Sequence, residues 1–227
     1  HAHAVTLDAS GRMLFVPDLG LDRVMIYRLD AQRGALEPND PPWVSVPAGS
    51  GPRQIAFHPN GAYAYLINEL NSTIIAFRYD ASRGTLEPIQ TVPTLPYGYL
   101  GKSTTAEVQI TPDGRYLATG HTTSSETVEQ VTILRVNPDA TLSAFATFTT
   151  PDSPLGMAWL RNDVLAITRT NVAGNNQVFV YKFDDSVPSL TQIDVEPTGT
   201  FNTAVVLHPS GKWLYAQDST GKAIRAF

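Results

Sequence analysis

Apolar residues along this chain gather in short runs of three to five residues, and successive runs enclose a polar turn. Four of these turns share one pattern: residues 8–11, 58–61, 111–114 and 208–211. Residues 160–163 stand in the same place in a further unit, without the late Gly. Pro or Ala early in the turn and Gly late is hairpin chemistry, because Pro fixes φ and Gly accepts a positive φ. The runs on both sides are almost continuously apolar. They therefore predict strands buried on both faces.

The turns recur at a nearly constant distance. Their last positions are 11, 61, 114, 163 and 211, which are 50, 53, 49 and 48 residues apart. A third strand with clearer alternation of apolar and polar residues follows each turn, over 23–29, 73–79, 131–136, 178–183 and 223–227. A weaker fourth strand is expected in the first four units, and the fifth unit ends before one. No window shows the 3.6-residue period of a helix.

Short strands in units of about 50 residues are typical of propeller blades. We therefore expect an all-β fold, a β-propeller with about five four-stranded blades, the last of them incomplete. The whole chain, 1–227, is predicted to be one domain, with blades at about 1–48, 49–101, 102–151, 152–198 and 199–227. Two stacked sandwiches are the rival reading. They are disfavoured because sandwich strands do not repeat one turn motif at a fixed distance.

The composition limits the kinds of partner that this chain is expected to bind. The 227 residues are 42% hydrophobic, which predicts a sizeable core, and the net charge of -5 argues against a nucleic-acid partner. No apolar stretch is long enough to span a membrane. The chain has no cysteine, which excludes disulfides and thiolate metal sites. We expect a cytoplasmic protein, and a secreted one remains open because the absence of cysteine fits either compartment.

Ionisable residues occupy one register of the repeat, at the end of the second strand of each unit. They are Asp18, Glu69, His121, Arg169 and Asp218. In a propeller these strand ends converge on the mouth of the central channel, where ligands bind. The inner strands add His3 and Arg53, and Arg53 follows the flexible segment Gly49-Ser50-Gly51-Pro52. The competing interpretation, favoured for Asp18 and Asp218, is that such side chains cap turns.

The other histidines carry weaker signals. His1 and His3 lie two residues apart and so on one strand face, which could be half of a metal site. No third ligand is matched to them, so we expect no metal. His58 and His208 stand in the turns themselves and are expected to stabilise them.

Several motifs in residues 1–120 resemble one family in order and spacing. They are His1-Ala2-His3-Ala4, Val16-Pro17-Asp18-Leu19-Gly20 with Asp22-Arg23, Gly49-Ser50-Gly51-Pro52-Arg53, Ala56-Phe57-His58-Pro59, Asn68-Glu69-Leu70, Ala106-Glu107-Val108 and Pro112-Asp113-Gly114-Arg115. The chain is similar here to the seven-bladed β-propeller lactonases, a family with 6-phosphogluconolactonases and fungal carboxymuconate cyclases. The cyclase relatives place a His, an Arg, a Glu and a second Arg around the channel. His3, Arg53 and Glu69 match the first three, and this sequence has His121 at the fourth.

The resemblance implies a lactonase-like hydrolase or cyclase, acting on a sugar lactone or a carboxymuconate-type acid. Arg53 would stabilise negative charge on the reacting carboxyl group, His3 or His121 would act as general acid–base, and Glu69 would orient a histidine. Arg169, Lys102 and Asp18 are expected to bind an anionic small-molecule substrate. No metal or organic cofactor is required.

Five units are fewer than the seven of the family, and two further readings remain open. One is a non-catalytic propeller that serves as a binding scaffold. The other is a truncated or engineered propeller with no selected activity. An open arc would leave unpaired blade edges, so we expect either ring closure or self-association through those edges.

Overall fold

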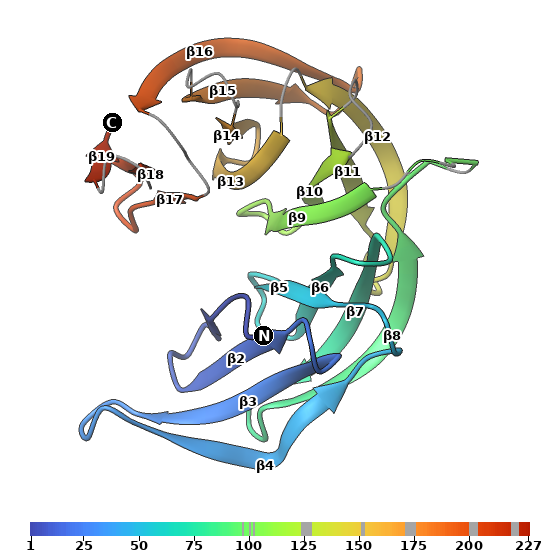
Figure 1. The fold of residues 1–227 in the computed structure, drawn as a ribbon, viewed down its shortest axis with the longest axis vertical. Helices are drawn as coiled ribbons and strands as arrows, with labels where there is room; N and C mark the ends of the chain where they lie inside the picture. The colour runs from blue at the N-terminus through green and yellow to red at the C-terminus, as the bar shows by residue number, and fades with distance from the viewer. Residues whose placement is uncertain are drawn as a thin grey trace. The chain divides into compact units, whose positions relative to one another are not determined.

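The computed structural model is built of strands alone across the residues that it describes: 1–96, 98–99, 101, 103–123, 129–150, 153–170, 176–199, 204–218 and 223–227. These strands form five antiparallel sheets (Figure 1). The first four sheets have four strands each, and the last has three. The prediction of an all-β propeller with an incomplete last blade is therefore confirmed. No helix in this part of the chain is long and apolar enough to cross a membrane.

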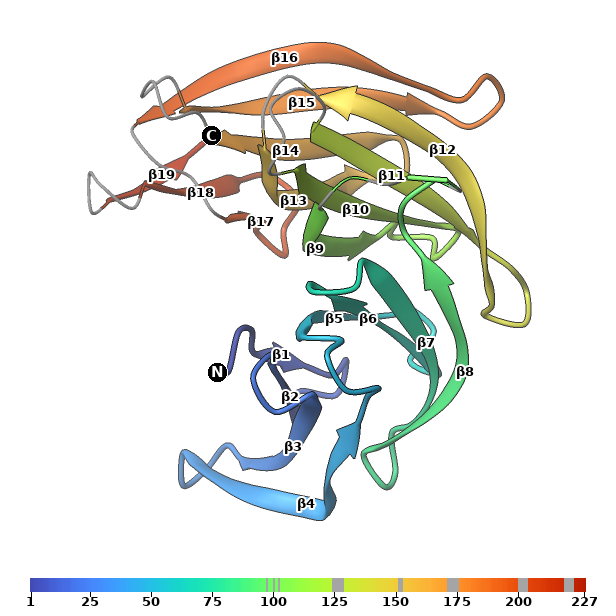
Figure 2. The ribbon, with the colours of Figure 1, turned by 45° about the vertical axis from the view of Figure 1, so that its right-hand side comes forward.

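Each sheet is a meander, in which strands next to each other in the sequence pair with each other. Figure 2 shows this order plainly for β5 to β8. The first two sheets are made of β1 (Thr6–Leu7), β2 (Met13–Asp18), β3 (Arg23–Asp30) and β4 (Ala35–Ser45), then β5 (Pro52–Phe57), β6 (Tyr63–Asn68), β7 (Thr73–Asp80) and β8 (Thr85–Pro93). The other three are made of β9 (Ser103–Ile110), β10 (Tyr116–Thr123), β11 (Glu129–Val136) and β12 (Leu142–Thr150), then β13 (Ser153–Arg161), β14 (Val164–Thr170), β15 (Asn176–Asp184) and β16 (Ser189–Gly199), and last β17 (Val205–Leu207), β18 (Leu214–Asp218) and β19 (Ala223–Ala226).

The repeated turns join the first and second strands of the blades, as the sequence predicts. Gly11, Gly61, Gly114 and Gly211 have φ between 67° and 75°, the left-handed region that glycine enters without a Cβ clash. The predicted turn role of the two histidines is also confirmed. Nδ1 of His58 accepts a hydrogen bond from Asn60 N, and Nδ1 of His208 accepts one from Ser210 N, both at 3.1 Å.

The chain divides into two compact units. Unit 1 comprises residues 1–99 and 135–143, and unit 2 comprises 100–134 and 144–227. The hairpin 135–143 joins unit 1 through two kinds of contact. The side chain of Gln90 both donates to the carbonyl of Leu142 and accepts from its N–H, and Tyr65 Oη donates to the carbonyl of Ala140.

The core of unit 1 fills the space between its first two sheets. The rings of Phe15, Phe57 and Tyr79 lie with their centroids 4.9 to 5.5 Å apart. Tyr79 Oη donates to the buried carboxylate of Asp8 at 3.1 Å. Burial raises the pKa of the Tyr79 phenol, and the negative charge of Asp8 raises it further. Leu86 of β8 packs into the same cluster. The third and fourth strands of the second blade therefore pack against the first blade.

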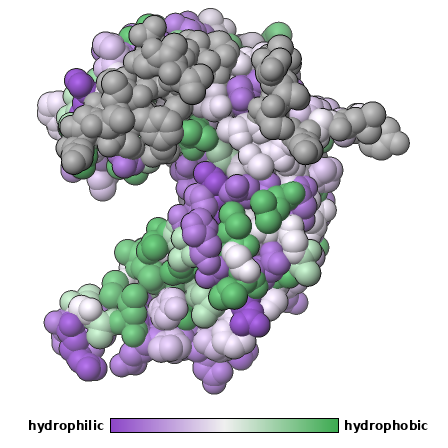
Figure 3. Space-filling view, in the orientation of Figure 1, coloured by the Kyte–Doolittle hydropathy of each residue, from purple (hydrophilic) through white to green (hydrophobic). Residues whose placement is uncertain are grey.

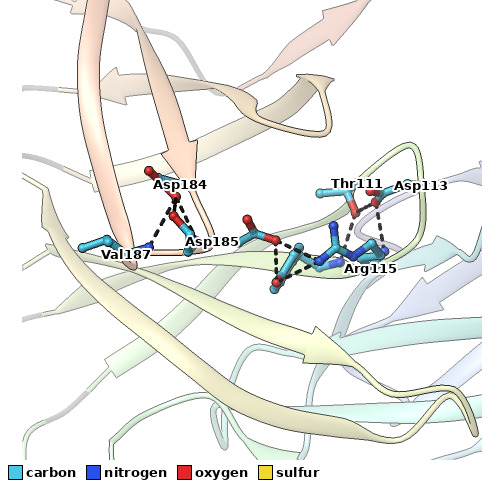
Figure 4. A network of polar contacts seen from close by, with 8 residues as sticks. Thr111, Asp113, Arg115, Asp184, Asp185 and Val187 are labelled. Atoms are coloured by element: carbon cyan, nitrogen blue, oxygen red, sulfur yellow. Dashed lines mark hydrogen bonds and ion pairs between the residues drawn. The ribbon is translucent and has the colours of Figure 1, made fainter.

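Unit 2 repeats this arrangement and adds a polar brace on its surface. Phe183 packs against Tyr116, Phe145 and Trp159. At the exposed edge, Asp185 accepts hydrogen bonds from Arg115 Nη2 at 2.8 Å and from Tyr116 Oη at 3.0 Å (Figure 4). These contacts join the turn after β9 to the turn after β15.

Candidate active site

The ionisable residues of the repeat lie where the pattern places them along the backbone. Asp18 ends β2, Glu69 follows β6, His121 lies in β10, Arg169 in β14, and Asp218 ends β18. Lys102 lies outside the described residues, as do the side chains of Arg169 and Asp218. The geometry of a site can therefore be followed at His3, Asp18, Arg53, Glu69 and His121.

Arg53 and Glu69 form the closest pair of these side chains. Nη1 of Arg53 donates to Oε2 of Glu69, and the two side chains are only 20% and 21% exposed. The register of β5 against β6 shifts between Pro52 and Gln54, so Arg53 sits at a bulge. Bulges turn a side chain away from the regular alternation of a strand. This bulge and the residue after β6 bring the guanidinium and the carboxylate together.

His3 joins this pair from the N-terminal segment. Its N–H donates to the carbonyl of Pro17 at 3.0 Å, which ties the segment to β2. The His3 side chain retains solvent exposure, yet partial burial lowers its pKa from the usual value. The Arg53 guanidinium lowers the pKa further, while the Glu69 carboxylate opposes the shift. His3, Arg53 and Glu69, from three separate segments of unit 1, therefore lie within one electrostatic environment.

Asp18 is engaged in its own turn. Its Oδ1 accepts hydrogen bonds from Gly20 N and Leu21 N, both at 3.1 Å, and from the amino group of His1 at 2.7 Å. These contacts give the carboxylate a capping role, which is the reading that the sequence favours. Its expected role in substrate binding remains a prediction.

His121 has a different environment, inside unit 2. Its side chain is fully buried, with Nδ1 3.5 Å from Ser103 Oγ. Its Nε2 has no hydrogen-bond partner within the described part of the chain. Burial lowers the pKa of His121 to about 4. The imidazole is therefore neutral at pH 7, which suits a base or a hydrogen-bonding group better than an acid.

Asp22, which precedes β3 and contacts the loop before Arg53, is a residue that the sequence pattern did not single out for the site. Both carboxylate oxygens of Asp22 accept hydrogen bonds from this loop, from Gly49 N and Gly51 N at 2.8 Å each. Asp22 appears in the family motif, but its partners lie 27 and 29 residues away, and no local signal marks them.

Gly51 makes this loop sensitive to substitution. It has a φ of 64°, and a Cβ would lie 2.5 Å from Cγ of Leu70. We expect Gly51→Ala to lower the free energy of unfolding by about 2 kcal/mol, because a positive φ and a steric overlap both act. The overlap is partly relieved because Leu70 is 54% exposed and can move.

Gly49 is the matched control. It has a φ of 79° and no atom within 4 Å of its Cβ position, so Gly49→Ala tests the backbone cost alone. Urea unfolding of both variants is the measurement. Equal losses of stability would show that the contact with Leu70 does not matter.

Two other features bear on where ligands could bind. Among the described residues, no group of three or more His, Asp or Glu could hold a metal ion. A groove of about 400 Å³ lies in unit 2, and His121 is not among the residues that line it. Its walls are formed by Leu160, Val178, Val180, Asp194, Glu196, Leu207, Gly211, Lys212, Trp213, Leu214 and Phe227. Most of these side chains are apolar, and none is a predicted site residue.

The visible surface of unit 1 carries both apolar and polar atoms (Figure 3). Leu21 and Leu70 are 56% and 54% exposed, and both follow second strands of their blades, close in sequence to Asp18 and Glu69. Glu69 is therefore followed directly by an exposed apolar residue, Leu70.

Comparison with known proteins identifies relatives of the chain. A 6-phosphogluconolactonase of Serratia proteamaculans (strain 568) is 33% identical over 198 residues, which are 87% of this chain and 58% of that protein. A 6-phosphogluconolactonase of Erwinia tasmaniensis is 40% identical over 123 residues, 54% of this chain and 36% of that protein. The chain thus spans little more than half of the Serratia relative.

A solved structure supports the fold. The periplasmic gluconolactonase of Pseudomonas aeruginosa superposes with a TM-score of 0.78 at 24% identity, covering all of this chain and 56% of that one. Residues 1–166 match the family described as lactonase, 7-bladed beta-propeller. This match includes His3, Arg53, Glu69 and His121. The chain therefore belongs to the family of seven-bladed β-propeller lactonases.

Proposed function

We propose that this chain carries the catalytic cluster of a sugar-lactone hydrolase, with 6-phosphogluconolactone or a related aldonolactone as substrate. The observation that carries the proposal is the convergence of His3, Arg53 and Glu69 in unit 1. Two relatives named 6-phosphogluconolactonase support the choice of substrate class.

Arg53 is suited to the charge that develops in this reaction. Water adds to the lactone carbonyl, and the carbonyl oxygen becomes an oxyanion before the ring C–O bond breaks. A guanidinium held in a largely buried position stabilises that oxyanion more strongly than water does. Glu69 fixes the direction of the guanidinium through the Nη1–Oε2 contact, so that the planar group is held in one orientation.

His3 is suited to move the proton. A neutral imidazole can take a proton from the attacking water and return it to the ring oxygen that leaves. The pKa of His3 is below 6.5, because of partial burial and the nearby Arg53. His3 is therefore mostly neutral at pH 7, in the form that a general base requires.

This assignment predicts the pH dependence of hydrolysis. A lowered pKa keeps His3 unprotonated to lower pH than an ordinary histidine, so kcat/KM should fall in acid with a midpoint below pH 6.5. The measurement is the hydrolysis of 6-phosphogluconolactone between pH 5 and 7.5, corrected for the spontaneous reaction.

His58→Gln is the control for this profile, because His58 serves a turn and should not change it. A midpoint above pH 6.5 would contradict the role of His3. Absence of turnover with 6-phosphogluconolactone, gluconolactone and a carboxymuconate would favour a binding scaffold instead of an enzyme.

A further inference from the structure

We propose that Asp22 is a positioning residue that holds the Arg53–Glu69 pair in place through the loop before β5. The catalytic part of this inference rests on the proposed function. Its geometry stands on contacts within unit 1 alone.

Asp22 grips one side of the loop. Oδ2 accepts from Gly49 N and Oδ1 accepts from Gly51 N, each at 2.8 Å, so one carboxylate fixes two backbone amides. These hydrogen bonds hold the pKa of Asp22 below its usual value, and the bond from Gly51 N has the largest effect. The carboxylate is therefore ionised at every pH at which the enzyme would work.

The residues after β6 grip the other side. Glu69 N donates to the carbonyl of Gly51 at 2.8 Å, and Leu70 N donates to the carbonyl of Ser50 at 3.0 Å. Asn71 Nδ2 donates to Ser50 Oγ at 3.1 Å, and Ser50 is fully buried. The loop is thus held between Asp22 and the segment that carries Glu69. Arg53 leaves this loop two residues after Gly51.

The internal repeat shows that the backbone at this position does not need a carboxylate. Ser72 occupies the equivalent place one blade later, with the same φ of 51° as Asp22. The two residues play the same backbone role: the carbonyl of Asp22 accepts from Val46 N, and that of Ser72 accepts from Thr94 N, both at 3.0 Å. Asp22 differs from Ser72 in having a carboxylate. Both oxygens of this carboxylate accept hydrogen bonds from the loop before Arg53.

The repeat also supplies the variant that tests the proposal. Asp22→Ser installs the residue that the next blade uses, so it retains a side chain that tolerates this φ and removes the two carboxylate contacts. Asp30→Ser is the matched control, because Asp30 accepts from Gln32 N and Arg33 N in a turn at the other end of its strand.

Two readouts separate positioning from stability. The first is the NMR titration of the His3 ring. Since Arg53 lowers the His3 pKa, its displacement in Asp22→Ser should raise that pKa above the parent value, and Asp30→Ser should leave it unchanged. The second is kcat/KM for 6-phosphogluconolactone, which should fall about tenfold or more in Asp22→Ser at a temperature where both variants are folded.

An unchanged His3 titration in folded Asp22→Ser overturns the proposal, whatever happens to activity. A parent chain without lactonase activity overturns the proposed function but leaves the titration to decide the role of Asp22. A His3 shift in both variants also overturns the proposal, because it would show a general effect of destabilisation.

Discussion

Replacing Arg53 by Ala should lower kcat/KM for a sugar lactone by about 100- to 1,000-fold, the usual effect of removing one donor to an oxyanion. The substitution removes the guanidinium and leaves the Glu69 carboxylate, which is 21% exposed, without this partner. An unbalanced negative charge there would repel the oxyanion and would also raise the His3 pKa, because the Glu69 contribution would no longer be opposed. Both effects act in the same direction.

Arg78→Ala provides the matched control. Arg78 belongs to the same blade and forms an ion pair with Glu87 at 2.7 Å, but the two side chains are 61% and 69% exposed. An exposed pair contributes little to stability, so this variant should keep parental activity. Arg53→Lys should fall between the two, since an ammonium keeps the charge but not the planar fork of donors. Lactonase activity that survives Arg53→Ala would show that the site is elsewhere.

Much of the fold could be predicted from the sequence because its signals are local. The turn around Gly61 and its three counterparts fixes where first and second strands meet, and a period near 50 residues fixes the blade. The run 63–67 is apolar at every position, and β6 is correspondingly buried along almost its whole length. Pattern and structure agree where a single strand and its own turn decide the outcome.

The arrangement of the site could be predicted only in part. The repeat places Glu69 at the end of a strand, but the contact with Arg53 depends on a bulge that no residue type announces. The hydrogen bonds from Gly49 and Gly51 to Asp22 link two blades. They could not be predicted from the sequence because they depend on how the two blades pack. The full burial of His121 is also a property of packing, because it depends on the elements around β10 and not on the residue type.

Acid should destabilise the protein through His121, and the sign follows from proton counting. The folded pKa is about 4 and the ordinary value is 6.5. Between pH 4 and 6.5 the unfolded chain holds a proton on this ring that the folded chain does not, so stability rises with pH in this window and falls as pH drops through it. A difference of 6.5 minus 4 corresponds to about 3 kcal/mol at most, all of it lost below pH 4.

The measurement is the free energy of unfolding in urea at pH 7, 5.5 and 4.5, for the parent and for His121→Asn, whose amide does not titrate. The variant should show a weaker pH dependence than the parent in this window, whatever its stability at pH 7. The lowered pKa of His3 contributes to the pH dependence of both proteins alike. The carboxylates of Asp8 and Asp22 have lowered pKa values and act below the window, so they do not mask the effect. His58→Asn should keep the parental slope, because His58 serves an exposed turn. Equal slopes for the parent and His121→Asn would mean that the ring is hydrated or protonated in the folded state. In that case the buried imidazole could not be the source of acid sensitivity.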